Sequence, residues 1–198
     1  MEALKQNGFN GDTATSYADR LTMATDNSIY QLLPMRWCFP RSTADVALIA
    51  RLAGEERFNA LTFSPRGGTG TNGQSLNTGI VVDMSRHMNR ILEINVEQGW
   101  VKVEAGVIKD QLNQYLRPFG YFFSPELSTS NRAALGGMIN TDASGPKARW
   151  WPAKPPITCW ACGRYCWAAR MIPAPCRRRW RKRLLWTRPP KGVSTARC

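Results

Sequence analysis

The sequence predicts an α+β fold for roughly its first 145 residues. Short apolar runs bounded by turn residues alternate with two amphipathic segments of helical spacing, and no segment repeats. The apolar residues make up 43% of the 198, enough for a core. No apolar run approaches the roughly 20 residues that a membrane-spanning helix needs. At this length we expect one ordinary domain or a small pair of subdomains.

The first helix is expected over residues 41–54. Ser42 or Thr43 can accept hydrogen bonds from the first turn, and Asp45 suits the positive end of the helix dipole. Gly54 is a suitable terminator. The expected apolar face consists of Val46, Ile49, Ala50 and Ala53.

Short strands are expected after this helix, and the pair Gln98-Gly99 predicts a hairpin turn between the last two. A second helix is expected at Val107–Leu116, ended by Pro118 and Gly120. The predicted strands are Ala60–Phe63, Ile80–Met84, Ile91–Asn95 and Trp100–Glu104.

Charge divides the chain near residue 145. All 14 acidic residues lie at or before Asp142, whereas 14 of the 27 Lys and Arg lie beyond Ser144. The tail also holds six of the eight Trp, five of the six Cys and eight of the 13 Pro. The two parts are therefore different kinds of sequence. Met1–Thr25 lacks a basic start followed by an apolar stretch, so we expect no secretory signal and a cytoplasmic location.

A glycine-rich motif, S-P-R-G-G-T-G-T-N-G-Q, occupies residues 64–74. Its glycine spacing is that of a dinucleotide-binding turn, but such a turn must open a helix and be followed by an acid about 20 residues later. Here an apolar strand begins at Ile80, and Asp83 comes too early. No Gly-Lys-Ser/Thr follows, which excludes a Walker A loop. A strand–loop–strand remains, either an anion-binding concavity of glycine amides or a flexible turn.

A second loop, P-E-L-S-T-S-N-R-A-A-L-G-G-M-I-N-T-D-A-S-G at residues 125–145, is also rich in glycine and hydroxyl side chains. Two such loops are what gripping one pyrophosphate from two sides would require. Their pairing favours the anion-binding interpretation of the first loop over the flexible turn.

These motifs resemble the FAD-binding domain of the vanillyl-alcohol oxidase/PCMH family. The first loop followed by I-V-V-D-M-S-R-H-M-N-R-I-L is similar to the first half of that domain, as are F-P-R-S-T-A-D-V, V-E-A-G-V and S-N-R-A-A-L-G-G-M-I-N-T-D-A-S-G. The likeness covers roughly residues 17–145. Within the family the chain is most similar to bacterial FAD-linked D-2-hydroxyacid dehydrogenases (D-lactate, glycolate, D-2-hydroxyglutarate). T-D-N-S-I-Y-Q-L-L-P at residues 25–34 resembles the large members with an added iron–sulfur domain.

The resemblance implies a two-subdomain FAD-binding fold, incomplete here. We expect an N-terminal extension at 1–35, a partial FAD-binding domain at 36–145 and a separate tail at 146–198. The implied function is oxidation of a small 2-hydroxy acid by hydride transfer to FAD, as part of a larger enzyme. The substrate-binding and proton-accepting residues would lie in a later cap region, so no catalytic residue is named. The chain is not expected to be competent alone.

The family also implies which residues hold FAD. The first loop would wrap the pyrophosphate with its amides and the hydroxyls of Thr69 and Thr71, and the second loop would close from the other side. Covalently flavinylated relatives carry His where this chain has Thr69, so we expect non-covalent FAD. Ala134 stands where relatives usually have Thr. The expected cofactor-binding residues are Arg66, Gly67, Gly68, Thr69, Gly70, Thr71, Asn72, Gly73, Gln74, Pro125, Ser128, Gly136, Gly137, Asn140, Ala143, Ser144 and Gly145.

The tail offers an alternative function. Cys159-x-x-Cys162-x-x-x-Cys166 has the look of a metal or iron–sulfur site, and R-R-R-W-R-K-R at residues 177–183 that of a nucleic-acid arm. In that case the chain would be a basic nucleic-acid- or metal-binding module acting through its tail.

A third interpretation is that the tail is out of frame. Relatives continue after A-S-G with roughly Y-G-K-T-S-D-H-V-L-G-V-R-A-V-L-L-G-G. With suitable synonymous codons, the part from K-T-S onward, read one base later, gives K-P-P-I-T-C-W-A-C-G-R-Y-C-W-A-A, which is residues 154–169 of this chain. We therefore expect a frameshifted, disordered tail with no metal site and no nucleic-acid partner.

Four isolated positions carry simpler expectations. His87, the only histidine, is expected to have a surface role rather than a catalytic one. Cys38, between aromatic neighbours, is expected to be buried. Glu93 and Glu104 are expected to be solvated rather than an acid/base couple.

Overall fold

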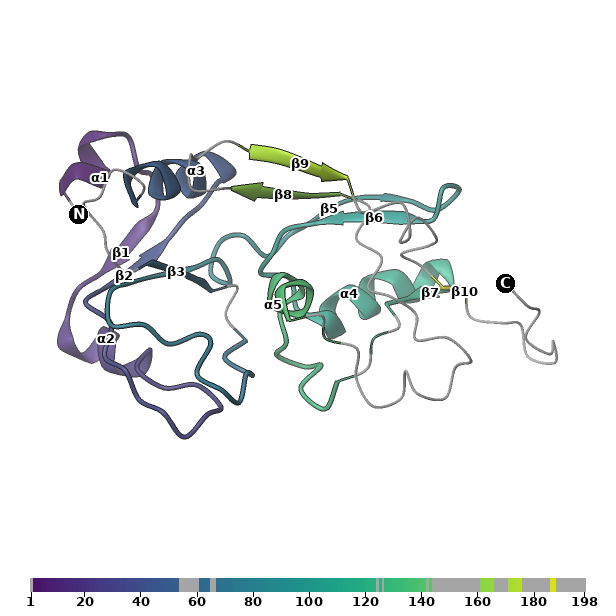
Figure 1. Cartoon of the computed structure of the whole chain (residues 1–198). Coiled ribbons are helices and arrows are strands. Elements are labelled where there is room, and N and C mark those ends of the chain that lie inside the picture. The colour runs from purple at the N-terminus through teal and green to yellow at the C-terminus, as the bar shows by residue number, and fades with distance from the viewer. Residues whose placement is uncertain are drawn as a thin grey trace.

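The computed structural model describes residues 2–53, 61–64, 67–123, 125, 127–141, 143, 161–165, 171–175 and 186–187. The first 143 residues fold as two groups of helices and strands that lie side by side (Figure 1). One group is built on a four-stranded sheet and the other on a β hairpin packed over helices. The predicted α+β class with two subdomains is confirmed.

The sheet of the first group has the order β1-β2-β4-β3. Its strands are β1 (Asp12–Ala14), β2 (Arg36–Phe39), β3 (Leu61–Ser64) and β4 (Ile80–Asp83). β1 is antiparallel to β2, whereas β2 and β3 both run parallel to β4. Parallel strands need a crossover, and helix α3 (Thr43–Leu52) provides it between β2 and β3. The predicted strands β3 and β4 are confirmed, whereas β1 and β2 were not predicted.

Helix α3 begins where the sequence predicts. Ser42 Oγ accepts a hydrogen bond from Asp45 N at 3.2 Å, and the Asp45 carboxylate accepts one from Ser42 N at 3.0 Å, which together form a capping box. The buried Asp45 carboxylate also accepts hydrogen bonds from the amides of Asn10 and Arg41. This carboxylate therefore fixes the start of α3 and ties the chain near residue 10 to it.

Both faces of the sheet are buried because successive β2 side chains point to opposite sides. Cys38 packs with residues from α1 (Glu2–Gln6) and α3, which confirms its predicted burial. Trp37 and Phe39 pack on the other face, towards helix α2 (Tyr17–Thr22). The cluster around Cys38 consists of Leu4, Phe9, Cys38, Ile49, Leu52, Ile80 and Val82. The first 35 residues thus contribute to the same sheet and the same core.

The second group begins with the predicted hairpin. β5 (Ile91–Asn95) and β6 (Trp100–Val103) pair antiparallel around Gly99, whose φ is 68°. Helix α4 (Lys109–Leu116) follows, and the 3-10 helix η2 (Arg117–Phe119) extends it to Gly120, which has the left-handed conformation expected of a helix terminator. A further helix, α5 (Leu135–Asn140), was not predicted. The shared core consists of Val107, Leu112, Leu116, Phe123, Ala133, Leu135 and Met138.

Three short strands lie in the tail. β8 (Ala161–Tyr165) pairs antiparallel with β9 (Met171–Pro175), and β10 (Trp186–Thr187) pairs with β7 (Tyr121–Phe122). The sequence predicted no regular structure here. For β8 and β9 the difference has a simple basis, since antiparallel pairing uses only backbone groups and adjacent segments can pair locally. The prediction of a disordered tail otherwise concerns residues outside the described ones and stays a prediction.

Glu104 and His87, two of the isolated positions considered from the sequence, have specific partners. Glu104 forms an ion pair with Arg90 at 2.9 Å and its side chain is 10% exposed, so the expectation that Glu104 is solvated is wrong. Sequence could not show that the β5–β6 register would bring Arg90 beside it. His87 Nε2 lies 2.7 Å from Asp12 Oδ2, linking β1 to the chain after β4. Among the described residues, no helix is long and apolar enough to cross a membrane.

Candidate functional site

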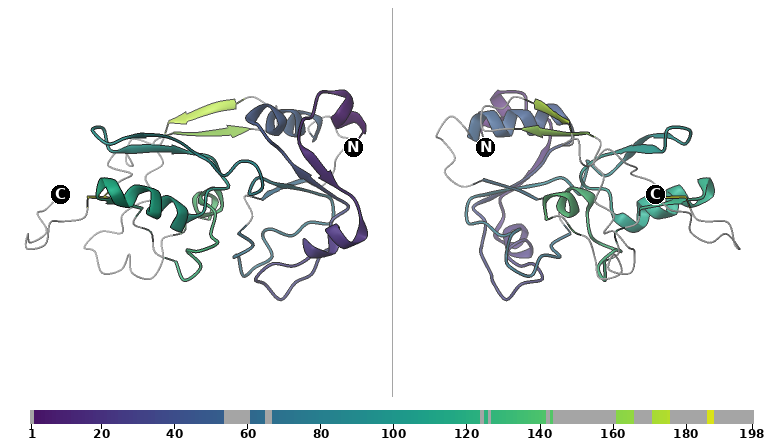
Figure 2. Two further views of the ribbon diagram at one scale, coloured as in Figure 1. Left: turned by 180° about the vertical axis from the view of Figure 1, so that it is seen from behind. Right: turned by 45° about the vertical axis from the view of Figure 1, so that its right-hand side comes forward.

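The glycine loop, residues 67–79, connects β3 to β4 without an intervening helix, which confirms the predicted strand–loop–strand. It lies between two other segments. The segment 24–32 after α2 flanks it on one side, and the loop that precedes α5 flanks it on the other (Figures 1 and 2). Three stretches far apart in the sequence therefore meet here.

Gly67 is the point where the two predicted loops touch. A Cβ atom on Gly67 would lie 2.5 Å from the carbonyl oxygen of Arg132 and 3.3 Å from Ala133 Cα. Both contacts are with backbone atoms, so only glycine fits this position. The prediction that the two loops come together is met at this contact.

Gly68 has a φ of 55°, a left-handed conformation that side-chain-bearing residues rarely adopt. Its carbonyl oxygen accepts a hydrogen bond from Asn27 N at 2.9 Å. The segment before the domain therefore fixes the orientation of this peptide.

The Asp26 carboxylate provides a second link between segment 24–32 and the glycine loop. Asp26 Oδ2 accepts a hydrogen bond from Ser75 Oγ at 2.8 Å, and Oδ1 accepts one from Ser28 N at 2.8 Å. Desolvation raises the pKa of this carboxyl, but the hydrogen bonds from Ser28 and Ser75 outweigh it, so the pKa lies below its ordinary 3.8. Asp26 is therefore ionised at neutral pH.

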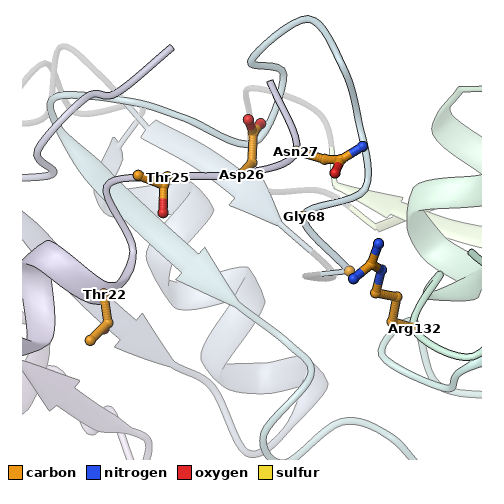
Figure 3. Close-up of a pocket in the computed structure, with 7 residues that line it drawn as sticks. Thr22, Thr25, Asp26, Asn27, Gly68 and Arg132 are labelled. Carbon is orange, nitrogen blue, oxygen red and sulfur yellow. The ribbon is translucent and has the colours of Figure 1, made fainter. Parts of the chain in front are cut away.

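These segments enclose an open hollow of about 270 Å³ (Figure 3). Its Arg132 side chain points towards the backbone at Gly68, whereas the Asp26 carboxylate points away from Arg132. Arg132 is exposed and has no ion-pair partner among the described residues. The lining residues are Thr22, Thr25, Asp26, Asn27, Gly67, Gly68 and Arg132. Unpaired guanidinium and glycine backbone on facing walls suit a small anion.

The amides at the start of α5 are already engaged. Leu135 N donates to Val107 O and Gly136 N donates to Ala105 O, each at 2.9 Å. Met138 N donates to Ala134 O, as expected within the helix. Gly136 therefore cannot offer its N–H to a ligand without losing this bond, whereas no such competing bond is seen for Gly137 in the part of the chain that the structure describes.

The other predicted site residues have different environments. Gly67 and Gly68 line the hollow, but residues 69–74 continue the loop away from it. Gln74 Oε1 accepts a hydrogen bond from Asn72 N at 3.1 Å and lies against Gly70. Pro125 is buried, Ser128 and Asn140 are exposed, and Ala143 packs against the second core. Arg66, Ser144 and Gly145 lie outside the described residues.

Five lining residues were not predicted, namely Thr22, Thr25, Asp26, Asn27 and Arg132. Four of them belong to the chain before residue 35, which the sequence assigned to an extension. The stretch T-D-N-S at residues 25–28 could have indicated an ordered turn in this segment, because Asp and Ser favour hydrogen bonds from side chain to backbone. Arg132 lies inside the second motif, among the glycine and hydroxyl residues from which the anion-binding loop was predicted.

Comparison with known proteins is consistent with this arrangement. The family model described as "FAD binding domain" matches residues 34–153. D-2-hydroxyglutarate dehydrogenase of Escherichia coli (strain K12) is 80% identical over 146 residues, and that of Pseudomonas putida 64% identical over the same number. Each match covers 73% of this chain and 14% of the relative. The chain thus spans about 14% of the length of these curated relatives.

Solved structures show the same fold at low sequence identity. A structure of alkyldihydroxyacetonephosphate synthase superposes with a TM-score of 0.64 at 20% sequence identity. The aligned region covers 75% of this chain and 29% of the synthase chain. A second structure of that enzyme has a TM-score of 0.66 and 18% identity. At these identities the likeness supports the fold alone.

Proposed function

Because this chain belongs to the FAD binding domain family, we propose that the hollow at Gly67, Gly68 and Arg132 holds the diphosphate of a non-covalently bound FAD. The observation that carries the proposal is the backbone contact between Gly67 and Arg132. It places an unpaired guanidinium opposite the glycine backbone that Asn27 orients. The walls are close enough for one small anion to meet both.

The residues present fit the diphosphate of FAD but not the whole molecule. Sites that enclose a drug-sized ligand have volumes of about 300–1,000 Å³, whereas the hollow has about 270 Å³. A Cβ on Gly68 would meet nothing nearer than Asp26 at 3.8 Å, so the space beside this glycine is open. The Gly68 amide and the Arg132 guanidinium are the donors we assign to the phosphate oxygens. Thr71 and Asn140 are candidates for contacts with the rest of FAD.

For the longer protein we propose the activity named for its relatives, oxidation of a 2-hydroxy acid of the D-2-hydroxyglutarate type. FAD, when bound, supplies the hydride acceptor for this chemistry, and the chain described here supplies binding and orientation. We assign no catalytic residue to this chain. A cytoplasmic location and the absence of a nucleic-acid partner stay predictions.

For the tail we propose that residues 146–198 are read out of frame. The 16 residues at 154–169 that a one-base shift reproduces support this, and so do matches of 146 residues in the similar dehydrogenases. The family model extends to residue 153. Sequencing the DNA across codons 140–160 tests the proposal, because an intact reading frame with no shift relative to the relatives' DNA contradicts it.

FAD binding is tested by fluorescence titration of the purified 198-residue chain. We expect saturable quenching that ADP competes away, and release of all FAD on denaturation. Gly68→Ala should weaken binding about tenfold, because the methyl group enters the space beside the diphosphate.

Gly99→Ala is the matched control. Gly99 also has a positive φ, of 68°, and has open space around it, so the backbone cost of the substitution is similar. It lies in the β5–β6 turn, away from the hollow, and should leave the Kd for FAD unchanged. An equal loss of affinity in both variants, or no saturable binding by the wild-type chain, would overturn the proposed site.

A further inference from the structure

Segment 24–32 contacts the glycine loop at three places. Asn27 N donates to Gly68 O at one end of the loop, and Asp26 accepts from Ser75 Oγ at the other. Between them, a Cβ on Gly73 would lie 3.1 Å from the Tyr30 ring. Asp26, Asn27 and Tyr30 all precede residue 34, where the match to the FAD binding domain family begins.

Segment 24–32 is itself closed by backbone contacts. Thr25 and Gln31 form an isolated antiparallel bridge, and Leu32 N donates to Ala24 O at 2.9 Å. Asp26 Oδ1 accepts from Ser28 N within the segment while Oδ2 reaches the glycine loop. One carboxylate therefore shapes the segment and joins it to the loop.

The charge of Asp26 is difficult to explain as part of an anion site. The Asp26 carboxylate points away from Arg132 and is hydrogen-bonded to Ser28 and Ser75, and any interaction of its negative charge with a diphosphate is repulsive. Its benefit must therefore come from the geometry that it holds. The two roles can be distinguished by removing the charge of Asp26. A purely electrostatic role predicts tighter FAD binding, whereas a positioning role predicts weaker binding when the hydrogen bonds are lost with the charge.

We infer that segment 24–32 is a third wall of the cofactor site, and that Asp26 is a positioning residue that keeps the glycine loop in its anion-binding shape. Asp26 acts on the ligand only through Ser75 and the Gly68 peptide. The inference rests on the proposed FAD site for its ligand, whereas the effect on the loop is independent of FAD.

The test compares Asp26→Ala with Asp26→Asn in the full chain. Asn has the same shape and can still accept from Ser28 N while its amide group donates to Ser75 Oγ, whereas Ala loses both hydrogen bonds. We expect Asp26→Ala to weaken FAD binding about tenfold, although a negative charge has been removed. Asp26→Asn should bind FAD as tightly as the wild type, or more tightly. Glu93→Gln removes one exposed carboxylate from the β5–β6 hairpin and serves as the charge control.

Amide hydrogen exchange without FAD gives the second measurement. Peptides covering residues 67–76 should exchange about tenfold faster in Asp26→Ala than in the wild type, and at the wild-type rate in Asp26→Asn and Glu93→Gln. Tighter FAD binding in both Asp26 variants would show a purely electrostatic role and overturn the inference. Unchanged exchange in Asp26→Ala would also overturn it. Failure of the wild-type chain to bind FAD, with the exchange result as expected, would reject the FAD site but not the positioning role.

Discussion

The two glycine-rich loops resemble each other in sequence but differ in how they reach the hollow. The first presents backbone, because Gly67 and Gly68 line the hollow directly. The second presents a side chain, Arg132, because the amides of Leu135 and Gly136 are bonded to the carbonyls of Val107 and Ala105. Glycine content therefore does not measure how many amides are free for a ligand. The carbonyl groups of neighbouring segments decide that.

The largest expected effect is that of Gly67→Ala, which tests the contact between the loops. The new Cβ would lie 2.5 Å from Arg132 O, so the backbone of one loop must move. We expect the free energy of unfolding in urea to fall by about 2 kcal/mol. The Kd for FAD should rise on the order of 30-fold.

Gly70→Ala is the control for this substitution within the same loop. Its Cβ would meet the end of the flexible Gln74 side chain rather than backbone, so the structure can adjust at a smaller cost. Equal losses in the two variants would mean that the contact at Gly67 does not organise the site.

The second effect concerns the side chain that the second loop contributes. Arg132→Gln should weaken FAD binding about tenfold and reduce its dependence on ionic strength, because one charged contact with the diphosphate is lost. Arg132→Lys should recover part of the affinity. Isothermal titration at two salt concentrations measures both quantities. Arg117→Gln, at an exposed arginine after α4, should change neither the affinity for FAD nor its dependence on ionic strength. Equal changes in Arg117→Gln and Arg132→Gln would contradict the assignment of Arg132 to the diphosphate.

The smallest effect tests the second loop's backbone. A Cβ on Gly137 would meet nothing within 4 Å outside its own helix. Gly137→Ala should therefore raise the free energy of unfolding by about 0.5–1 kcal/mol, since alanine favours helix more than glycine does. The Kd for FAD should stay within about twofold. A tenfold loss would show that FAD lies as close to Gly137 as to Gly68 and would remove the distinction between the loops.

Local chemistry made part of the structure predictable. The α3 cap at Ser42 and Asp45, the β5–β6 turn at Gly99 and the helix terminator at Gly120 all depend on residues within a few positions of each other. By contrast, α5 carries two glycines and depends on the contacts of Leu135 and Gly136 with the chain at 105–107, so its sequence gave a weak helical signal.

By itself, the sequence determined the local elements, the motifs of the FAD binding domain and the contrast in charge between the first part and the tail. Only the tertiary structure decided which residues surround the hollow. Asp26 meets Ser75 across 49 positions of the chain, and Arg132 reaches the hollow from the second group of elements. The physical reason is that such contacts depend on how whole elements pack, whereas helix caps and the hairpin turn at Gly99 depend on residues that are close in the sequence.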